Sequence, residues 1–210
     1  MIDSGVCQLM SQEVFMPGAT TLGLVCKDGV ILASERRVSY GYFVMSKSGK
    51  KVFKITDTIG AACAGLVADM QILMREVSAY IHIYNYETTR DAGVKSTAKL
   101  MASLLFQRRM FPYLTQTIVA GVDSSGPSLY VLDPLGSVLD DKYASVGTGS
   151  EIAIGVLESE YKDDMSIEEA KKVVADAFKS AVARDVGSGE GADLLIMTKD
   201  GIKEESLKFA

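Results

Sequence analysis

Tryptophan is absent from this chain of 210 residues, and histidine and cysteine are scarce, with one and three copies. His82 lies in a run with helical character, so metal clusters built on histidine and histidine-assisted serine or cysteine catalysis are poor candidates. Cys7, Cys26 and Cys63 are odd in number and widely spaced, which fits neither a disulfide framework nor a zinc site and favours a reducing compartment. We therefore expect no metal and no organic cofactor.

The chain also lacks an excess of positive charge and a long apolar run. It has 22 Lys and Arg against 27 Asp and Glu, a net charge of −5, so a nucleic-acid partner has no electrostatic support. No segment has the apolar length of a membrane span, and residues 1–18 lack the basic start and apolar block of a secretory signal. A phosphate loop of the Walker type is missing too, so ATP binding by that means is not expected.

What the chain does contain is a series of β-prone runs and amphipathic helices. Two apolar runs flank Lys27-Asp28-Gly29 and predict a β-hairpin, because Asp and Gly tolerate the backbone angles of a tight turn. Apolar residues at helical spacing predict a helix from Val67 to Tyr84, and the capping box Ser166-Ile167-Glu168-Glu169 opens another. Further strands are predicted at 43–45, 51–56, 59–65, 117–122, 128–132, 142–146, 193–198 and from 202, and further helices at 94–105 and from 150.

The order of these elements predicts an α+β fold. The strands form three hairpin-linked blocks, and two helices separate each block from the next. Such grouping argues against a doubly wound parallel sheet and favours antiparallel sheets layered with helices. A four-layer αββα sandwich, with helices outside two central antiparallel sheets, uses all of the apolar faces. The length suffices for one such core, and no break in composition suggests a second domain.

Several short motifs, in a fixed order along the chain, match one known family. They are Thr20-Thr21-Leu22-Gly23, Lys27-Asp28-Gly29-Val30, Glu35-Arg36-Arg37, Lys50-Lys51-Val52-Phe53-Lys54-Ile55, Ala64-Gly65-Leu66-Val67-Ala68-Asp69, Gly147-Thr148-Gly149-Ser150, Gly155-Val156-Leu157-Glu158 and Arg184-Asp185. By these motifs the chain resembles the archaeal-type β subunits of the proteasome core particle, within the N-terminal-nucleophile (Ntn) hydrolase superfamily. The resemblance runs from about residue 18 to about residue 209, and it implies the αββα fold of that superfamily.

The resemblance also implies a division of the chain. In that family a precursor cleaves itself after a glycine and exposes a threonine, whose hydroxyl attacks peptide carbonyls. Gly18 matches the glycine, so residues 1–18 resemble a propeptide and residues 19–210 the Ntn-hydrolase domain. The nucleophile position holds Ala19 instead of threonine.

The spacing supports this register. The family has an acidic residue and a lysine at fixed distances from its nucleophile, and Glu35 and Lys51 follow Ala19 by 16 and 32 residues. Adjacent residues of a strand point to opposite faces, so the side chain of Thr20 is expected to point away from the site.

The other residues of the catalytic site follow from the resemblance. Lys51 matches the lysine that assists deprotonation of the threonine, and the neighbouring Glu35 would tune its pKa. Asp185 and Ser188 match residues that hydrogen-bond around the terminal amine and the nucleophile. Thr148 stands where a serine is usual and keeps the hydroxyl. A purely structural ion pair between Glu35 and Lys51 is an alternative, and it is compatible with the catalytic interpretation.

Two further sets of residues complete the expected site. Gly65 matches the glycine whose backbone N–H helps to form the oxyanion hole. Val38, Gly49, Cys63 and Val67 match positions that line the pocket for the substrate side chain, which they would make apolar. Plain core packing is the alternative for each of these four residues.

Alanine has no hydroxyl, so the chain is expected neither to cleave itself nor to hydrolyse peptides at a useful rate. Two histories give this sequence: an active subunit whose threonine was replaced by alanine, or a naturally inactive β paralogue that builds the ring beside an active one. A structural ring subunit and an unrelated hydrolase of the same superfamily are further alternatives. A family α subunit is disfavoured, because the N-terminal helix of α subunits is missing from the sequence.

The resemblance implies a set of partners and a location. The partners are proteasome α subunits and other β subunits in stacked seven-membered rings, and unfolded polypeptide delivered by an ATP-driven unfoldase through the α ring. The expected location is the cytoplasm. Neither nucleic acid nor a membrane is an expected partner.

Overall fold

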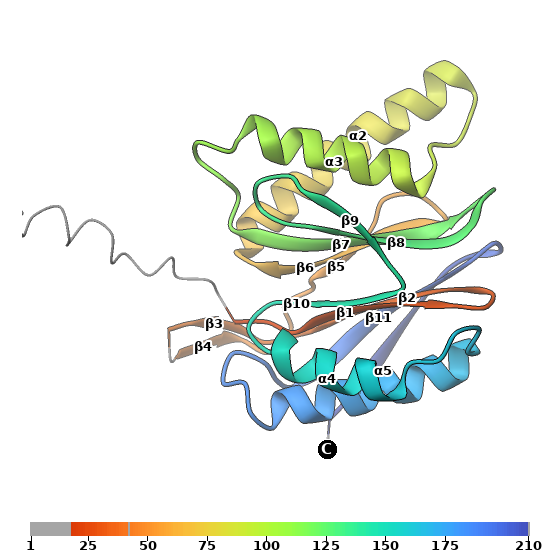
Figure 1. The fold of residues 1–210 in the computed structure, drawn as a ribbon. Helices are drawn as coiled ribbons and strands as arrows, with labels where there is room; N and C mark the ends of the chain where they lie inside the picture. Colours follow the sequence, from red (N-terminus) through yellow and green to blue (C-terminus); the bar gives the residue numbers. More distant parts are fainter. Residues whose placement is uncertain (1–17, 42, 210) are drawn as a thin grey trace, which may run out of the picture.

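The computed structural model of the chain describes residues 18–41 and 43–209. They form four layers, with two helices on either side of two stacked sheets (Figure 1). The helices are α2 (Val67–Thr88), α3 (Val94–Gln107), α4 (Ser150–Glu160) and α5 (Ile167–Val182). The strands are β1 (Thr21–Cys26), β2 (Gly29–Glu35), β3 (Val38–Tyr40), β4 (Phe43–Ser46), β5 (Val52–Lys54), β6 (Ile59–Gly65), β7 (Thr115–Asp123), β8 (Gly126–Leu132), β9 (Val138–Asp141), β10 (Tyr143–Val146), β11 (Gly191–Thr198) and β12 (Gly201–Lys208).

Both large sheets are antiparallel. The order in the first is β10-β1-β2-β11-β12, and in the second it is β5-β6-β7-β8-β9. In the first sheet β1 and β2 pair from Thr21 opposite Ser34 to Cys26 opposite Gly29, so the predicted Lys27-Asp28 turn closes the central hairpin. This register places the start of β1 beside the end of β2, where the N–H of Glu35 donates to the carbonyl of Thr20, the residue after Ala19.

Three hydrophobic clusters hold the four layers together, and each fills one interface. One lies between the second sheet and helices α2 and α3, another between the first sheet and helices α4 and α5, and the third between the two sheets. Helix α5 begins with the predicted capping box, in which Ser166 and Glu169 bond to each other's backbone N–H. The arrangement confirms the predicted α+β sandwich of two antiparallel sheets flanked by helices.

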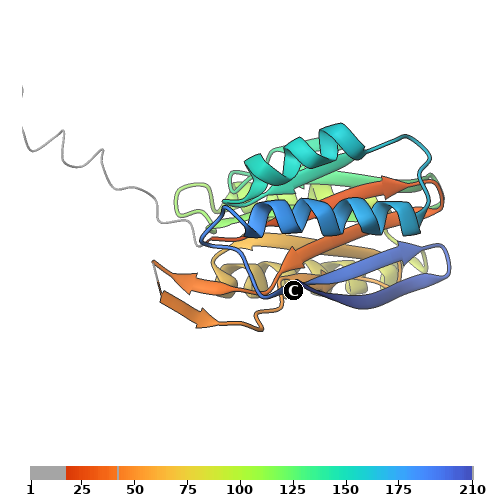
Figure 2. The ribbon, with the colours of Figure 1, turned by 90° about the horizontal axis from the view of Figure 1, so that it is seen from below.

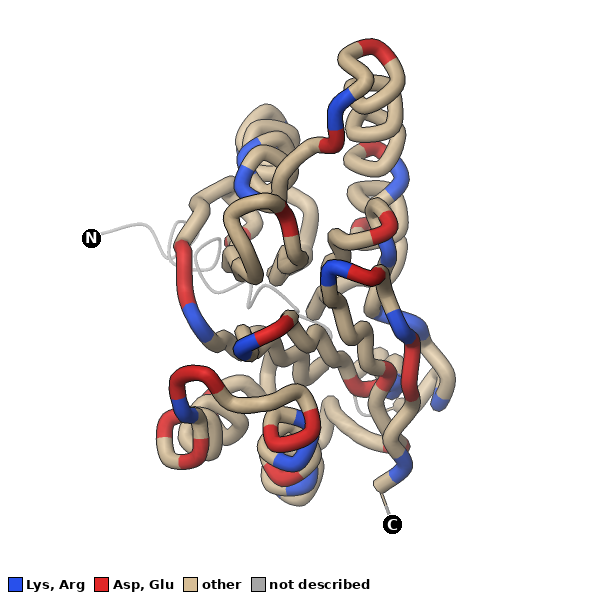
Figure 3. The backbone as a smooth tube through the Cα atoms, turned by 90° about the vertical axis from the view of Figure 1, so that its right-hand side faces the viewer, with Lys and Arg blue, Asp and Glu red and all other residues tan. Residues whose placement is uncertain are grey.

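Strands β3 and β9 were not predicted from the sequence, whereas β4 was predicted at 43–45, and all three lie at the margins of the fold. Strand β9 pairs only with β8 at an edge of the second sheet, and the β3–β4 hairpin extends beyond the sandwich (Figure 2). Their residues are mostly exposed, so they lack the buried apolar alternation that marks the central strands. Charged residues of both signs are spread over the strands and helices (Figure 3). Within the described residues, no helix is both long and apolar enough to span a bilayer.

Candidate active site around Ala19

Ala19 lies two residues before β1, at the end of the first sheet. Its side chain is fully buried in the cluster between the two sheets. Its N–H donates to Thr148 Oγ1 over 3.1 Å, and its carbonyl accepts from the N–H of Gly149 over 3.2 Å. At Gly147, where φ is +98°, a Cβ would lie 2.3 Å from the carbonyl oxygen of Ala19. The loop that leads into α4 therefore needs a glycine there to clamp the backbone of Ala19.

Glu35 and Lys51 form a buried ion pair beside this position. Glu35 ends β2 and Lys51 precedes β5, and their side chains are 0% and 2% exposed. The Lys51 ammonium donates to Glu35 Oε1 and, over 2.7 Å, to the carbonyl of Arg37. Glu35 Oε2 accepts from the N–H groups of Arg37 (2.5 Å) and Gly189 (3.2 Å). The Glu35 carboxylate is therefore held by three donors from three separate segments.

Burial is the main influence on the pKa values of this pair. Desolvation lowers the pKa of Lys51, although the Glu35 carboxylate and the more distant Asp185 oppose the shift. Desolvation also raises the pKa of Glu35, against the opposing effects of Lys51 and the two backbone N–H groups. An amine whose pKa is lowered by burial is better suited to accept a proton near neutral pH than an exposed lysine is. The pair is thus suited to the role that the resemblance implies for Lys51.

A second group of polar side chains surrounds Asp185. Its Oδ2 accepts hydrogen bonds from Thr148 Oγ1 over 2.8 Å and from Ser188 Oγ over 2.6 Å. Ser188 Oγ in turn lies 2.6 Å from Thr20 Oγ1, and both residues are fully buried. The N–H of Glu35 donates to the carbonyl of Thr20 over 3.1 Å, which joins this group to the Lys51 pair. The structure thus brings together all six residues that the sequence predicted for the catalytic site.

The expectation that Thr20 points away from the site was wrong. Its hydroxyl contacts Ser188, because the 185–189 loop covers the face of the β1 start opposite the inter-sheet cluster. Strand alternation separates Ala19 from Thr20, but predicted site residues line both faces of this segment. Within residues 18–41 and 43–209, the hydrogen bonds of the Lys51 ammonium go to Glu35 and Arg37 and to no hydroxyl. In this structure the Thr20 hydroxyl is therefore bonded to Ser188 and not to the Lys51 ammonium.

Gly149 makes room for the Thr20 hydroxyl, which gives a first prediction. A Cβ at Gly149 would lie 2.1 Å from Thr20 Oγ1 and 3.1 Å from Asp185 Oδ2, while the backbone there is ordinary (φ −85°). Gly149→Ala is expected to lower the free energy of unfolding by about 1–3 kcal/mol through overpacking. In the Thr20→Ala background, Gly149→Ala should lower the free energy of unfolding by about 1 kcal/mol less, because the Thr20 hydroxyl that clashes with the new Cβ is absent. Urea unfolding of the four variants measures this coupling, and strictly additive effects would contradict the contact.

The predicted oxyanion residue, Gly65, lies at the end of β6. Its φ is +133°, and a Cβ would lie 2.1 Å from the carbonyl oxygen of Leu114. Only glycine fits this backbone and this approach. Helix α2 begins two residues later, at Val67. The geometry explains the glycine without reference to catalysis, so the role of its N–H stays a prediction.

The four predicted pocket residues divide into two groups. Val38 and Gly49 are in contact, since a Cβ on Gly49 would lie 2.3 Å from Val38 Cγ2, and Val67 is half-buried at the start of α2. Cys63 instead is fully buried in the cluster beneath α2 and α3. Burial raises the pKa of its thiol to about 12, so it is an inert thiol near neutral pH. The location of Cys63 favours the core-packing alternative for this residue.

Sequence reasoning missed Arg37 and Gly189, which connect the two polar groups. The Arg37 guanidinium donates to the carbonyl of Val186 (2.9 Å) and to Glu190 Oε1 (3.2 Å). A Cβ at Gly189 would lie 2.2 Å from Arg37 Nη2, so any side chain there would displace the guanidinium from this position. Arg37 belongs to a motif that the sequence singled out, but the contact joins segments about 150 residues apart. In the described part of the chain, no cluster of three or more His, Cys, Asp or Glu could hold a metal ion.

Comparisons with known proteins give the family. A model of the proteasome subunit family matches residues 16–197. The chain is 49% identical to proteasome subunit beta 1 of Nitrosopumilus maritimus over 192 residues, which cover 91% of this chain and 96% of that protein. It is 44% identical to proteasome subunit beta 2 of Pyrobaculum neutrophilum (93% and 97% covered) and 49% identical to proteasome subunit beta 1 of Cenarchaeum symbiosum (90% and 97%).

The Glu35–Lys51 pair is buried inside an αββα sandwich, and Glu35 is bonded through its N–H to Thr20, directly before β1. This is the architecture of an Ntn hydrolase. The matches are more specific, and the chain belongs to the proteasome subunit family. Within that family its relatives are β subunits, so its role is that of a β subunit of the proteasome core. As a member of the family it assembles with other subunits into a proteasome complex.

Proposed function

We propose that this chain is a proteolytically inactive β subunit that does not cleave after Gly18 and loses at most part of residues 1–18 to another subunit. One observation carries the proposal: the nucleophile position is occupied by Ala19, whose methyl group has no oxygen to attack a carbonyl. Self-cleavage needs the same hydroxyl for its N-to-O acyl shift, so both reactions fail together. Loss of the nucleophile costs on the order of a million-fold in rate in a well-studied serine hydrolase.

The rest of the site is expected to keep the roles that the resemblance implies. Lys51, held by Glu35, would receive the proton of a hydroxyl at position 19. Thr148, Asp185 and Ser188 would hydrogen-bond around that residue; the 3.1 Å bond from the N–H of Ala19 to Thr148 supports this. The backbone N–H of Gly65 would stabilise the oxyanion. Of the four residues expected to line the side-chain pocket, we keep Val38, Gly49 and Val67, because Cys63 is fully buried in the core.

The segment before Ala19 is the proposed propeptide. Residues 1–17 lie outside the described residues, and Gly18 is the residue after which the family cleaves. We propose the division into propeptide 1–18 and domain 19–210 on the family's pattern. In a particle that contains an active β subunit, that subunit could remove part of the segment in trans, at a bond that its own specificity selects.

A natural structural ring subunit is the second candidate. Relatives carry the numbered names beta 1 and beta 2, which supports a setting in which this chain assembles with a catalytic β paralogue. The proposed partners are α subunits and other β subunits in stacked seven-membered rings in the cytoplasm. Unfolded polypeptide would enter through the α ring, delivered by an ATP-driven unfoldase. Codon 19 of the gene distinguishes this history from replacement of a threonine.

Intact mass spectrometry of the assembled particle tests the proposal. A particle whose only β subunit is this chain is expected to contain it with residues 1–18 attached and to leave fluorogenic peptides uncleaved. Addition of a catalytic β subunit during assembly should restore hydrolysis without producing an N-terminus at Ala19 on this chain. Turnover by the particle built without a companion, or a mature N-terminus at Ala19 in it, would refute inactivity.

A further inference from the structure

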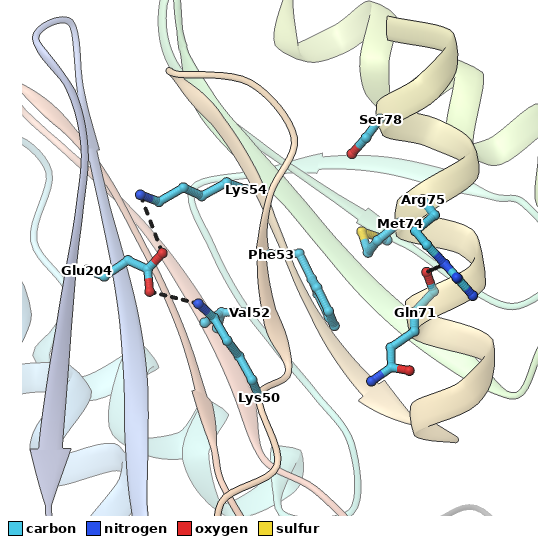
Figure 4. A pocket seen from close by; sticks show the side chains of 9 residues that line it. All are labelled: Lys50, Val52, Phe53, Lys54, Gln71, Met74, Arg75, Ser78 and Glu204. Carbon is cyan, nitrogen blue, oxygen red and sulfur yellow. Dashed lines mark hydrogen bonds and ion pairs between the residues drawn. The ribbon is translucent and has the colours of Figure 1, made fainter. Parts of the chain in front are cut away.

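Lys51 directly precedes a short strand at the edge of the second sheet. Strand β5 has three residues, and within the described residues it pairs only with β6, starting from Val52 opposite Ala62. A cavity of about 610 Å³ also borders β5, and there Lys50 reaches the carboxylate of Glu204 over 2.8 Å (Figure 4). Both of these side chains are exposed, and an exposed ion pair contributes little to stability. The position of the Lys51 backbone therefore depends on its contact with β6.

One residue of β6 connects Lys51 to the start of β1. The N–H of Cys63 donates to the carbonyl of Lys51 over 2.9 Å. In an antiparallel ladder the N–H and C=O of one residue point to the same side, so the carbonyl of Cys63 also points to the side of β5. There it accepts, over 2.9 Å, from the hydroxyl of Thr21, which belongs to the first sheet. The Thr21 hydroxyl thus joins the two sheets at the residue that holds Lys51.

Strand alternation and a second hydroxyl place Thr21 for this contact. Thr21 follows Ala19 by two residues, so both side chains share the face of this segment that meets the second sheet. Thr21 is fully buried, and its Oγ1 lies 2.7 Å from the Oγ of Ser34, its buried partner on β2. Because the single proton of the Thr21 hydroxyl goes to Cys63, Ser34 is the donor in this pair. Ser34 therefore sets the direction of the Thr21 hydroxyl.

We propose that Thr21 is a positioning residue of the active site, which sets where Lys51 lies relative to residue 19. The connection runs from the Thr21 hydroxyl through the backbone of Cys63 to the carbonyl of Lys51, while Glu35 holds the ammonium at the far end of the side chain. Without the Thr21 hydroxyl, the buried Cys63 carbonyl loses this donor, and the edge strand is free to shift towards the cavity. The inference rests on the proposed role of Lys51 as proton acceptor.

The competing explanation is that Thr21 only stabilises the contact between the two sheets. A buried hydroxyl that bonds to a carbonyl contributes to stability wherever it lies. Thr97 allows a comparison, because it is also fully buried and its hydroxyl donates to the carbonyl of Gly93 over 3.1 Å at the start of α3. A purely stabilising role predicts the same behaviour for Thr21→Val and Thr97→Val.

Urea unfolding of the full chain tests the connection without any catalysis. Thr21→Val is compared in two backgrounds, the chain as it stands and the Glu35→Gln, Lys51→Met double variant. We expect Thr21→Val to raise the equilibrium constant for unfolding about three- to tenfold less in the double variant, because no buried ion pair is left there to misplace. Thr97→Val should have the same effect in both backgrounds. Equal effects of Thr21→Val in the two backgrounds would overturn the proposal.

Peptide hydrolysis by the assembled Ala19→Thr particle gives the second measurement. In this background, Thr21→Val is expected to lower kcat about tenfold or more and to change KM less than about twofold, because a misplaced proton acceptor slows the chemical step. Thr21→Ser keeps the hydroxyl and should restore kcat. Ser34→Ala, a milder change that removes only the donor to Thr21, should lower kcat in the same direction.

The outcomes separate this inference from the proposed function. Thr97→Val should leave kcat of the Ala19→Thr particle unchanged. An equal kcat in the presence and absence of the Thr21 and Ser34 hydroxyls would overturn the positioning role. If the Ala19→Thr particle is itself inactive, the proposed roles of the site residues fail. The unfolding comparison then still decides whether Thr21 is connected to Lys51.

Discussion

Ala19→Thr is expected to produce a chain that cleaves itself after Gly18 and hydrolyses peptides. The substitution places a hydroxyl at the start of β1, next to the loop that holds the backbone of Ala19 through Thr148 and Gly149. The Glu35–Lys51 pair is already assembled nearby, so nothing else has to be supplied. Recovery of a nucleophile is worth up to about a million-fold in rate. Intact mass and a fluorogenic peptide assay on the assembled particle measure the two activities.

Ala19→Val is the matched control, because valine has the shape of threonine without its hydroxyl. Ala19 is fully buried, so both substitutions add the same two heavy atoms to the same space. The valine variant should stay uncleaved and inactive, while any loss of stability should be common to both. An inactive, uncleaved Ala19→Thr particle that assembles normally would show that the surrounding residues lack the proposed roles. Activity in both variants would show that hydrolysis comes from elsewhere.

The fold was predictable from the sequence wherever the elements are buried. Strand β2 is buried along its whole length, and α5 carries a capping box together with an apolar face, so local pattern and packing agree. Strand β9 has three exposed residues out of four, and nothing in its composition marks it as a strand. It exists because β8 offers it a partner, and such tertiary information is absent from a local window.

The site was predictable for a different reason. No physical pattern in the sequence links Glu35, Lys51 and Asp185, which lie up to 150 residues apart; the resemblance to a family joined them. Contacts that the family motifs do not specify were not predicted. Strand alternation predicted that the Thr20 side chain points away from the site. It does not take account of the 185–189 loop, which covers the other face of the strand and brings Ser188 to the Thr20 hydroxyl. The packing of Arg37 against Gly189 could not be predicted either. The reason for a glycine at position 189 is clear only once the structure shows the Arg37 guanidinium next to it.

Breaking the Glu35–Lys51 pair should have the largest effect on stability. Glu35→Gln keeps the shape of the side chain but removes the counter-charge, so the buried Lys51 ammonium, 2% exposed, keeps only neutral acceptors such as the carbonyl of Arg37. Removal of one member of a buried ion pair costs about 3–5 kcal/mol, because the other charge stays desolvated. Urea unfolding of the full chain, monitored by tyrosine fluorescence and by circular dichroism, gives the free energy of unfolding.

A second substitution separates the unpaired charge from the loss of packing. Lys51→Met removes the ammonium and keeps most of the buried volume, so the double variant Glu35→Gln with Lys51→Met contains no buried charge at this place. We expect it to be more stable than Glu35→Gln alone by about 1–4 kcal/mol, since apolar replacement of a whole buried pair is often neutral or better. If the double variant loses the sum of the two single effects, the two groups act independently. That result would contradict the claim that Glu35 and Lys51 stabilise the fold as a pair.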